Sequence, residues 1–113
     1  MIKKAIIISI KSTILSKKEK KLISKYKPWG LILFSRNINS LKQIKSLIKK
    51  IRIISKDSKF PIMIDEEGKT VTRLKKIINH NISQELFGKI YKSNPKRTIK
   101  VYKDYINYLS KIL

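Results

Sequence analysis

The chain has 113 residues, enough for one domain with a modest hydrophobic core. It carries 28 Lys and Arg against 7 Asp and Glu, which gives a formal net charge of +21. The absence of cysteine excludes disulfides and thiolate metal sites, and the single histidine, His80, cannot form a metal cluster alone. We therefore expect neither a metal nor a cofactor.

The positive charge has two interpretations. A basic excess raises the hypothesis of a nucleic-acid or anionic-membrane partner. The basic residues are nearly all Lys, however, they spread along the whole chain, and Ile dominates the apolar residues in the same way. That pattern is typical of compositional drift in an A/T-rich coding sequence. Because no nucleic-acid motif is present and aromatics do not alternate with basic residues as a stacking platform requires, we expect no specific nucleic acid.

The N-terminal segment "MIKKAIIISIKS" has the charged start of a signal peptide, but its apolar run, residues 5–10, is too short for a secretory h-region. This β-branched run predicts a strand buried on both faces. No stretch of the sequence is long enough to span a membrane, so we expect a cytoplasmic protein.

The next elements alternate between helix and strand. Ser16 and Glu19 have the spacing of a capping box and predict a helix over 17–26. "KPWG" ends this helix, and residues 30–34 predict a second buried strand. Residues 41–55 form the clearest helical pattern, with an apolar face opposite its lysines. Residues 61–65 predict a third strand.

Two further helices are predicted, one from Ser83 and one from near Asn94 with Pro95 at its first position. The last helix should turn an apolar stripe inward: Ile99, Tyr102, Tyr105, Ile106, Leu109 and Ile112. The order β-α-β-α-β-loop-α-α predicts an α/β fold with about three parallel strands in sequential order, and with the first two helices on one face of the sheet. The sequence reads as the opening of a larger α/β protein.

Three of the seven acids, Asp65, Glu66 and Glu67, stand together after the third predicted strand and before Gly68. Functional groups of parallel α/β folds gather beyond the carboxyl ends of the strands. A carboxylate there could accept hydrogen bonds from a polar ligand. The same acids could instead cap a turn or offset nearby lysines, and their position alone leaves both interpretations open.

Two motifs resemble the N-terminal domain of glycoside hydrolase family 3: "GLILFSRN" at 30–37 and "DEEGKTVTRL" at 65–74. The family carries G-[LVI]-I-L-F-x-R-N and D-Q-E-G-G-x-V-x-R-[LF] at these places. The branch with the greatest similarity is that of the bacterial β-N-acetylglucosaminidases (β-N-acetylhexosaminidases) of cell-wall recycling. Two positions depart from the pattern: Glu66 replaces Gln, and Lys69 replaces the second Gly, which costs stability if the backbone there has positive φ.

The resemblance implies a fold and a site. The family's domain is a (β/α)₈ barrel of the TIM type, which needs about 250 residues, so residues 1–113 would form its N-terminal part. Asp65 would accept hydrogen bonds from the hydroxyls of an N-acetylglucosamine-containing saccharide, and Arg73 would donate several from its planar fork. Glu67 and Gly68 would shape the loop, and Arg36 would serve loop packing or an ion pair.

The resemblance also implies that this chain alone is inactive. A retaining glycosidase needs a nucleophilic carboxylate and an acid/base group, which in this branch are an Asp and a His from segments corresponding to positions after Leu113. We read His80 as a loop or surface residue and expect no catalytic residue in this chain. It would be a truncated gene product, one part of a split enzyme whose remainder is its partner, or a non-catalytic fragment. The alternative is a small basic protein that binds RNA or anionic surfaces.

Overall fold

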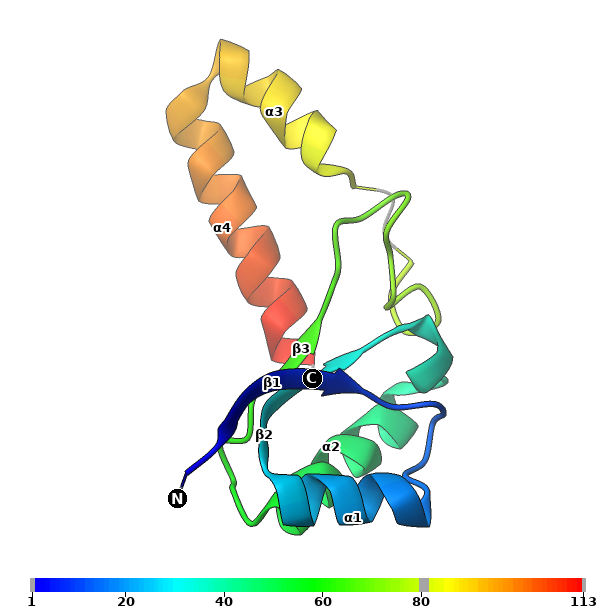
Figure 1. Cartoon of the computed structure of the whole chain (residues 1–113). Helices are drawn as coiled ribbons and strands as arrows, with labels where there is room; N and C mark the ends of the chain where they lie inside the picture. Colours follow the sequence, from blue (N-terminus) through cyan, green and yellow to red (C-terminus); the bar gives the residue numbers. More distant parts are fainter. Residues whose placement is uncertain (1, 80–81, 113) are drawn as a thin grey trace.

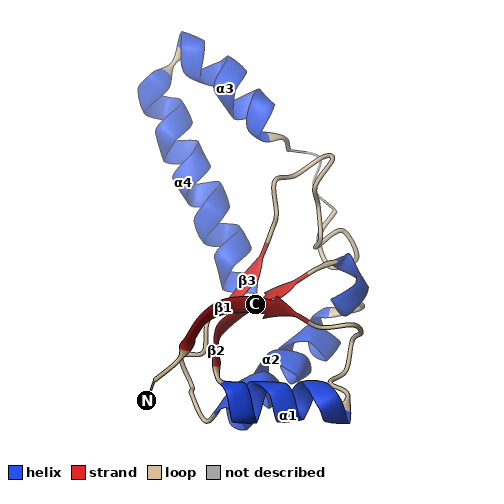
Figure 2. Cartoon of the chain, in the orientation of Figure 1, coloured by secondary structure: helices blue, strands red, loops and turns tan. Residues whose placement is uncertain are grey.

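The structure is a computed structural model that describes residues 2–79 and 82–112. Its elements in chain order are β1 (Lys4–Ser9), α1 (Lys17–Tyr26), β2 (Pro28–Leu33), the 3-10 turn η1 (Ser35–Asn37), α2 (Leu41–Ser55), β3 (Ile62–Ile64), α3 (Gln84–Ser93) and α4 (Pro95–Ile112) (Figure 1). The three strands are parallel and lie in the order β1-β2-β3. Figure 2 shows α1 and α2 on the same face of this sheet, so the predicted α/β arrangement is confirmed.

Local capping explains where the helices begin. The Ser16 hydroxyl accepts a hydrogen bond from the Glu19 amide, and the Glu19 carboxylate accepts one from the Ser16 amide, which completes the predicted capping box. The hydroxyls of Ser40 and Ser83 cap α2 and α3 by accepting from the amides of Gln43 and Leu86. Helices α1 and α2 therefore have the predicted bounds, 17–26 and 41–55. The strands differ from prediction by one or two residues at each end.

The hydrophobic core lies between the sheet and helices α1 and α2. Its buried side chains come from both layers and from the adjoining loops: Ile10, Leu15, Ile23, Leu31, Leu33, Ile38, Ile44, Leu47, Ile48, Ile51, Phe60 and Leu74. Gly30 lets β2 approach β3 closely, because a Cβ at this position would lie 3.0 Å from the carbonyl oxygen of Pro61. The chain thus needs glycine at this point of the sheet.

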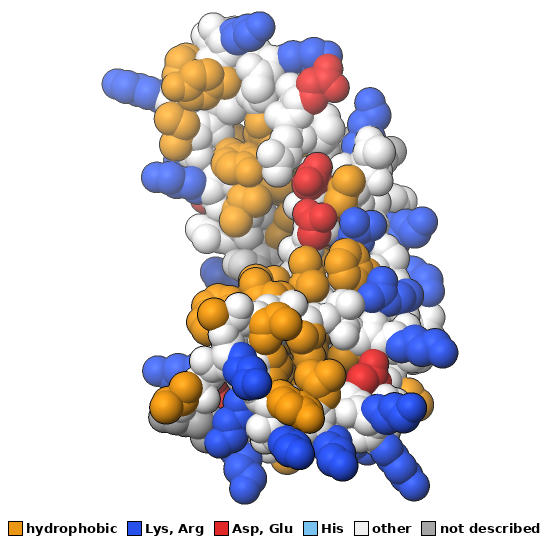
Figure 3. Space-filling view, viewed as in Figure 1, with side chains coloured by type: hydrophobic (Ala, Val, Ile, Leu, Met, Phe, Trp, Pro, Cys, Tyr) orange, Lys and Arg blue, Asp and Glu red, His pale blue; other side chains and the backbone are white. Residues whose placement is uncertain are grey.

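The prediction that the first strand is buried on both faces is wrong for this chain. Ile8 is partly buried, but Ile6 and Ile7 are 52% and 49% exposed. Helices α1 and α2 cover one face of the sheet, and no described element covers β1 from the other side (Figure 1). Figure 3 shows hydrophobic side chains gathered on the surface near β1 and over the α3–α4 hairpin.

Helices α3 and α4 form a hairpin that extends away from the sheet (Figure 1). The ring of Phe87 contacts the rings of Tyr102 and Tyr105 at centroid distances of 4.8 and 5.5 Å. The radius of gyration is 16.5 Å, whereas a compact domain of this size would have about 13 Å. The predicted inward stripe on α4 is only partly covered, since Ile99 and Ile106 remain 45% and 40% exposed.

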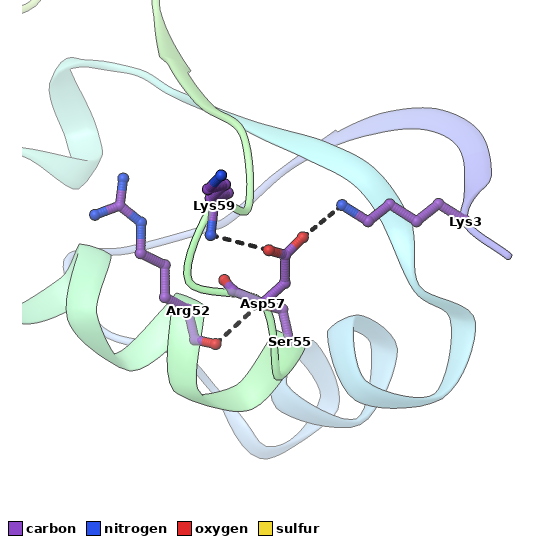
Figure 4. A network of polar contacts seen from close by, with 5 residues as sticks. All are labelled: Lys3, Arg52, Ser55, Asp57 and Lys59. Carbon is purple, nitrogen blue, oxygen red and sulfur yellow. Dashed lines mark hydrogen bonds and ion pairs between the residues drawn. The ribbon is translucent and has the colours of Figure 1, made fainter. Parts of the chain in front are cut away.

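A polar network joins the start of β1 to the turn between α2 and β3 (Figure 4). The Lys3 ammonium forms an ion pair with the Asp57 carboxylate, which also accepts a 2.9 Å hydrogen bond from the Lys59 amide. These two donors stabilise the charged carboxylate and hold the pKa of Asp57 below its usual value. The network fastens an edge strand that has little buried surface of its own.

We expect Asp57→Asn to lower the melting temperature at pH 7. A lowered pKa in the folded state means that the stabilisation is present above the unfolded-state pKa, near 3.8, and is lost as the pH falls through the lower folded-state value. The melting temperature of the variant should therefore depend less on pH below about pH 4 than that of the parent chain, as measured by circular dichroism. Asp104→Asn, which changes an exposed acid on α4, is the control. Equal melting curves for Asp57→Asn and the parent chain would contradict the assignment.

Candidate functional site

The carboxyl end of the sheet is held together by Asn37, a fully buried residue. Its side-chain amide donates to the carbonyl oxygens of Ile10 and Ser12 at 3.0 and 2.9 Å, and its side-chain oxygen accepts from the Phe34 amide at 2.9 Å. These bonds tie the segment after β1 to the segment after β2. The sequence motif contained Asn37, but no pattern showed that its side chain would point into the protein.

Arg36 belongs to the same junction. Its Nε donates to the Ile10 carbonyl oxygen at 3.1 Å and its Nη2 donates to the Ser9 hydroxyl at 3.2 Å. Its guanidinium also lies over the Phe34 ring, 4.7 Å from the centroid. This arrangement agrees with the loop-packing role that the sequence suggested for Arg36.

Asp65 and Arg73 face each other at the end of β3. The Arg73 Nη2 lies 3.7 Å from the Asp65 Oδ2, and the two side chains are 28% and 43% exposed. This distance allows an ion pair but exceeds a good hydrogen bond. The Arg73 guanidinium lies 5.5 Å from the centroid of the Phe34 ring. The structure therefore brings the two residues proposed as sugar ligands together on the carboxyl-end side of the sheet.

A tight turn separates these two residues in sequence. The amides of Glu67 and Gly68 donate to the Val71 carbonyl oxygen at 2.8 and 3.0 Å, and the Val71 amide donates back to Gly68. Gly68 is buried and has φ of 78°, a conformation that favours glycine. Glu67 takes part through its backbone, and its side chain is exposed. Lys69 has φ of 50°, so it occupies the strained backbone anticipated at this position.

Glu66 is a site residue that sequence reasoning missed. Its Oε2 accepts hydrogen bonds from the Arg73 amide at 2.7 Å and from the Leu74 amide at 2.9 Å. The side chain thus spans the loop and joins the end of β3 to the segment that carries Arg73. No periodicity reveals such a contact, because it depends on how the intervening turn folds.

Other features of the described residues bear on cofactors and membranes. Within 2–79 and 82–112 there is no group of three or more His, Cys, Asp or Glu side chains arranged to hold a metal ion. None of the helices in this part of the chain is long and apolar enough to cross a membrane. His80, read above as a loop or surface residue, lies outside the described residues.

Comparison with known proteins gives sequence relatives and structural neighbours of one kind. The chain is 38% identical over 95 residues to a β-hexosaminidase of Haemophilus ducreyi and 30% identical over 96 residues to one of Hydrogenovibrio crunogenus. These matches cover 83% and 85% of this chain but only 27% of either relative. The chain therefore spans about a quarter of the length of the curated relatives it matches. No protein-family model matches it.

Solved structures agree with the sequence relatives. NagZ from Neisseria gonorrhoeae in complex with N-trifluoroacetyl-D-glucosamine matches with a TM-score of 0.68 and 24% identity, over 81% of this chain and 27% of that chain. A glycoside hydrolase family 3 β-N-acetylglucosaminidase from Paenibacillus matches with a TM-score of 0.55 and 30% identity, over 60% of this chain and 14% of that chain.

The parallel sheet, the helices on one face and the polar loops beyond the carboxyl ends define an α/β protein with the opening strands of a (β/α)₈ barrel. Within that class, the chain belongs to glycoside hydrolase family 3 and corresponds to a truncated part of the N-terminal domain of its β-N-acetylglucosaminidases.

Replacing Lys69 with Gly should stabilise the protein. A side chain with a Cβ pays for left-handed backbone, and glycine removes that cost, although it also adds entropy to the unfolded chain. We expect the free energy of unfolding to rise by about 0.5–1 kcal/mol, measured by urea denaturation. Lys69→Ala retains the Cβ and serves as the control. A Lys69→Gly variant no more stable than Lys69→Ala would show that the turn carries no strain.

Proposed function

We propose that this chain forms one side of a sugar-binding pocket, as part of a glycosidase that releases terminal β-N-acetylglucosamine. The observation that carries the proposal is the pairing of Asp65 with Arg73 beyond the end of β3, with both side chains partly exposed. In this proposal residues 1–113 are part of a single barrel domain, and the saccharide belongs to cytoplasmic recycling of peptidoglycan.

The chemistry of the pair suits a neutral, hydroxyl-rich ligand. Ionised carboxylates only accept hydrogen bonds and guanidinium groups only donate them, so together the two side chains can satisfy both functions of neighbouring hydroxyls. Their separation of 3.7 Å leaves the hydrogen-bonding capacity of each largely unused. The Nε of Arg73 is buried and has no hydrogen-bond partner among the described residues, so a ligand would be held by the outer guanidinium nitrogens. The guanidinium also lies within cation–π distance of the Phe34 ring, 5.5 Å from the centroid.

The structural neighbours support the choice of saccharide. One of them is a complex with N-trifluoroacetyl-D-glucosamine, an analogue of N-acetylglucosamine. Carried to this chain, that ligand class agrees with the polarity of a site built on one acid and one arginine. An N-acetylglucosamine-containing saccharide is therefore the ligand that we assign to Asp65 and Arg73.

The three clustered acids are not arranged as the two catalytic groups of a retaining glycosidase. Those groups flank the bond that breaks, at about 5–5.5 Å from each other. Here Asp65 is paired with Arg73, and Glu66 accepts hydrogen bonds from two backbone amides. Glu67 follows directly in the same loop. We therefore assign binding to this loop and leave bond cleavage to groups outside these 113 residues.

The binding proposal predicts the effect of removing either ligand. Asp65→Ala and Arg73→Gln should each weaken the binding of N-acetylglucosamine about tenfold or more, because each deletes hydrogen bonds that involve a charged group. Titration of the isotope-labelled chain with the sugar, followed by NMR, measures this. Asp104→Asn on α4 should bind like the parent chain. Equal affinity for the parent chain and both site variants would overturn the assignment.

The second test is hydrolysis. The 113-residue chain should not cleave a chromogenic N-acetyl-β-glucosaminide, because Asp65 and Arg73 supply neither a nucleophile across the ring nor a proton for the leaving oxygen. Adding a polypeptide that supplies the remaining strands, if one is encoded downstream, should restore activity that depends on Asp65. Turnover by the chain alone that disappears in Asp65→Ala would show that the catalytic groups are already present.

A further inference from the structure

Glu66 uses one carboxylate oxygen for two consecutive backbone amides. Oε2 lies 2.7 Å from the Arg73 nitrogen and 2.9 Å from the Leu74 nitrogen. Both bonds share one acceptor oxygen, so removing that oxygen leaves both amides without this partner. They close a loop of nine residues, from 66 to 74, across the turn at Gly68 and Val71. The Glu66 side chain therefore fixes the position of the Arg73 backbone, from which the Arg73 side chain extends toward Asp65.

The guanidinium of Arg73 has few other restraints. Its Nε is buried and has no hydrogen-bond partner in the described part of the chain, and its Nη2 lies 3.7 Å from the Asp65 Oδ2, the distance of a loose ion pair. The Phe34 ring restrains it only through a cation–π contact, at 5.5 Å from the ring centroid. A half-exposed ion pair contributes little to holding two long side chains in place. The position of the Arg73 fork is thus determined chiefly by its backbone, and the backbone is anchored by Glu66.

Leu74 provides the other half of the anchor. Its side chain is 3% exposed and belongs to the hydrophobic core, so the bond from its amide to Glu66 lies between the core and the loop. Breaking that bond would leave an amide of a buried residue without its acceptor, which costs more than the bond itself contributes.

We propose that Glu66 is a positioning residue of the sugar site, which acts on the saccharide only through Arg73. It holds the Arg73 and Leu74 amides with one oxygen and thereby sets the guanidinium opposite Asp65. This inference rests on the proposed function for its effect on binding, but not for its effect on the loop. A single sp² oxygen suffices for the role, so glutamine should replace Glu66 and alanine should not.

Glu66 also lies close to α4. The pKa of Tyr105 is raised, first because the ring is partly removed from water and second because the negative charge of Glu66 opposes the tyrosinate. Glu66 also lines a groove of about 430 Å³ among α2, β3 and α4, together with Arg52, Ile62 and Ile106. Glu66→Gln removes the charge and keeps the oxygen, so it separates the electrostatic effect on Tyr105 from the anchoring of the loop.

The experiment compares Glu66→Gln and Glu66→Ala with Glu85→Gln and Glu85→Ala, which change an exposed acid on α3. Amide hydrogen exchange is measured at residues 73 and 74 and, as a reference for global stability, in α2. The NMR signal of the Arg73 Nε reports the side chain. Binding of N-acetylglucosamine is measured in each variant, and again with Arg73→Gln added.

In Glu66→Ala, the amides of residues 73 and 74 should exchange about tenfold or more faster than in the parent chain, after correction for any change in the exchange of α2. The NMR signal of the Arg73 Nε should also shift. Glu66→Ala should weaken sugar binding about tenfold, with no further loss when Arg73→Gln is present. Glu66→Gln should retain protection, signal and affinity. If Glu66→Ala does not fold, Glu66→Gln decides alone, because loss of protection at 73 and 74 in that variant overturns the proposal.

Other outcomes are equally decisive. Unchanged exchange in Glu66→Ala, or a Glu66→Gln variant that behaves like Glu66→Ala, would refute the positioning role. If Glu66→Ala weakens sugar binding further in a chain that already carries Arg73→Gln, Glu66 acts on the sugar directly. If the parent chain binds no sugar but the exchange and Arg73 signals change as expected, the proposed function fails while the positioning of Arg73 by Glu66 stands.

Discussion

The site depends first on the buried amide of Asn37. One side chain satisfies two carbonyl oxygens after β1 and one amide before η1, in a place that water does not reach. Unpaired groups there would be costly, so the ends of β1 and β2 have to stay together. This junction fixes Phe34, and Phe34 supports the guanidinium groups of both Arg36 and Arg73. Asp65, which follows the third strand, then lies beside a surface that Phe34 and the two arginines already form.

Glu66 has a similar role in the loop that follows β3, where its side chain accepts hydrogen bonds from two backbone amides. In both places a side chain with a polar end replaces the regular hydrogen bonds that the backbone loses where a strand ends. The lysines that make up most of the basic composition take no part in these contacts, since the residues that hold the carboxyl end are Asn37, Glu66, Arg36 and Arg73. The many lysines lie mostly at exposed positions, among them Lys45, Lys49 and Lys56 on and after α2.

Much of the fold was predictable because it is encoded locally. Ser16, Ser40 and Ser83 mark helix starts by capping, and Pro95 marks the start of α4. The burial of β1 was not predictable, because an apolar strand shows the same sequence whether or not a second layer covers it. The proximity of Asp65 and Arg73 entered through resemblance to a family. The contacts of Asn37 and Glu66 depend on the closed shape of loops, which has no period that a sequence could display.

The sequential order of the sheet has a kinetic consequence. β2 pairs with β1 and β3 pairs with β2, so each new strand joins the one before it in the chain. Helix α1 connects the first pair of strands, and α2 connects the second. No contact in the sheet must wait for a distant segment, so the loop-closure entropy of each step is small. On a ribosome, β1 and α1 would receive β2 within seconds of their own synthesis, and β3 soon afterwards. The order in which this region is made is also the order in which it can assemble, one strand at a time.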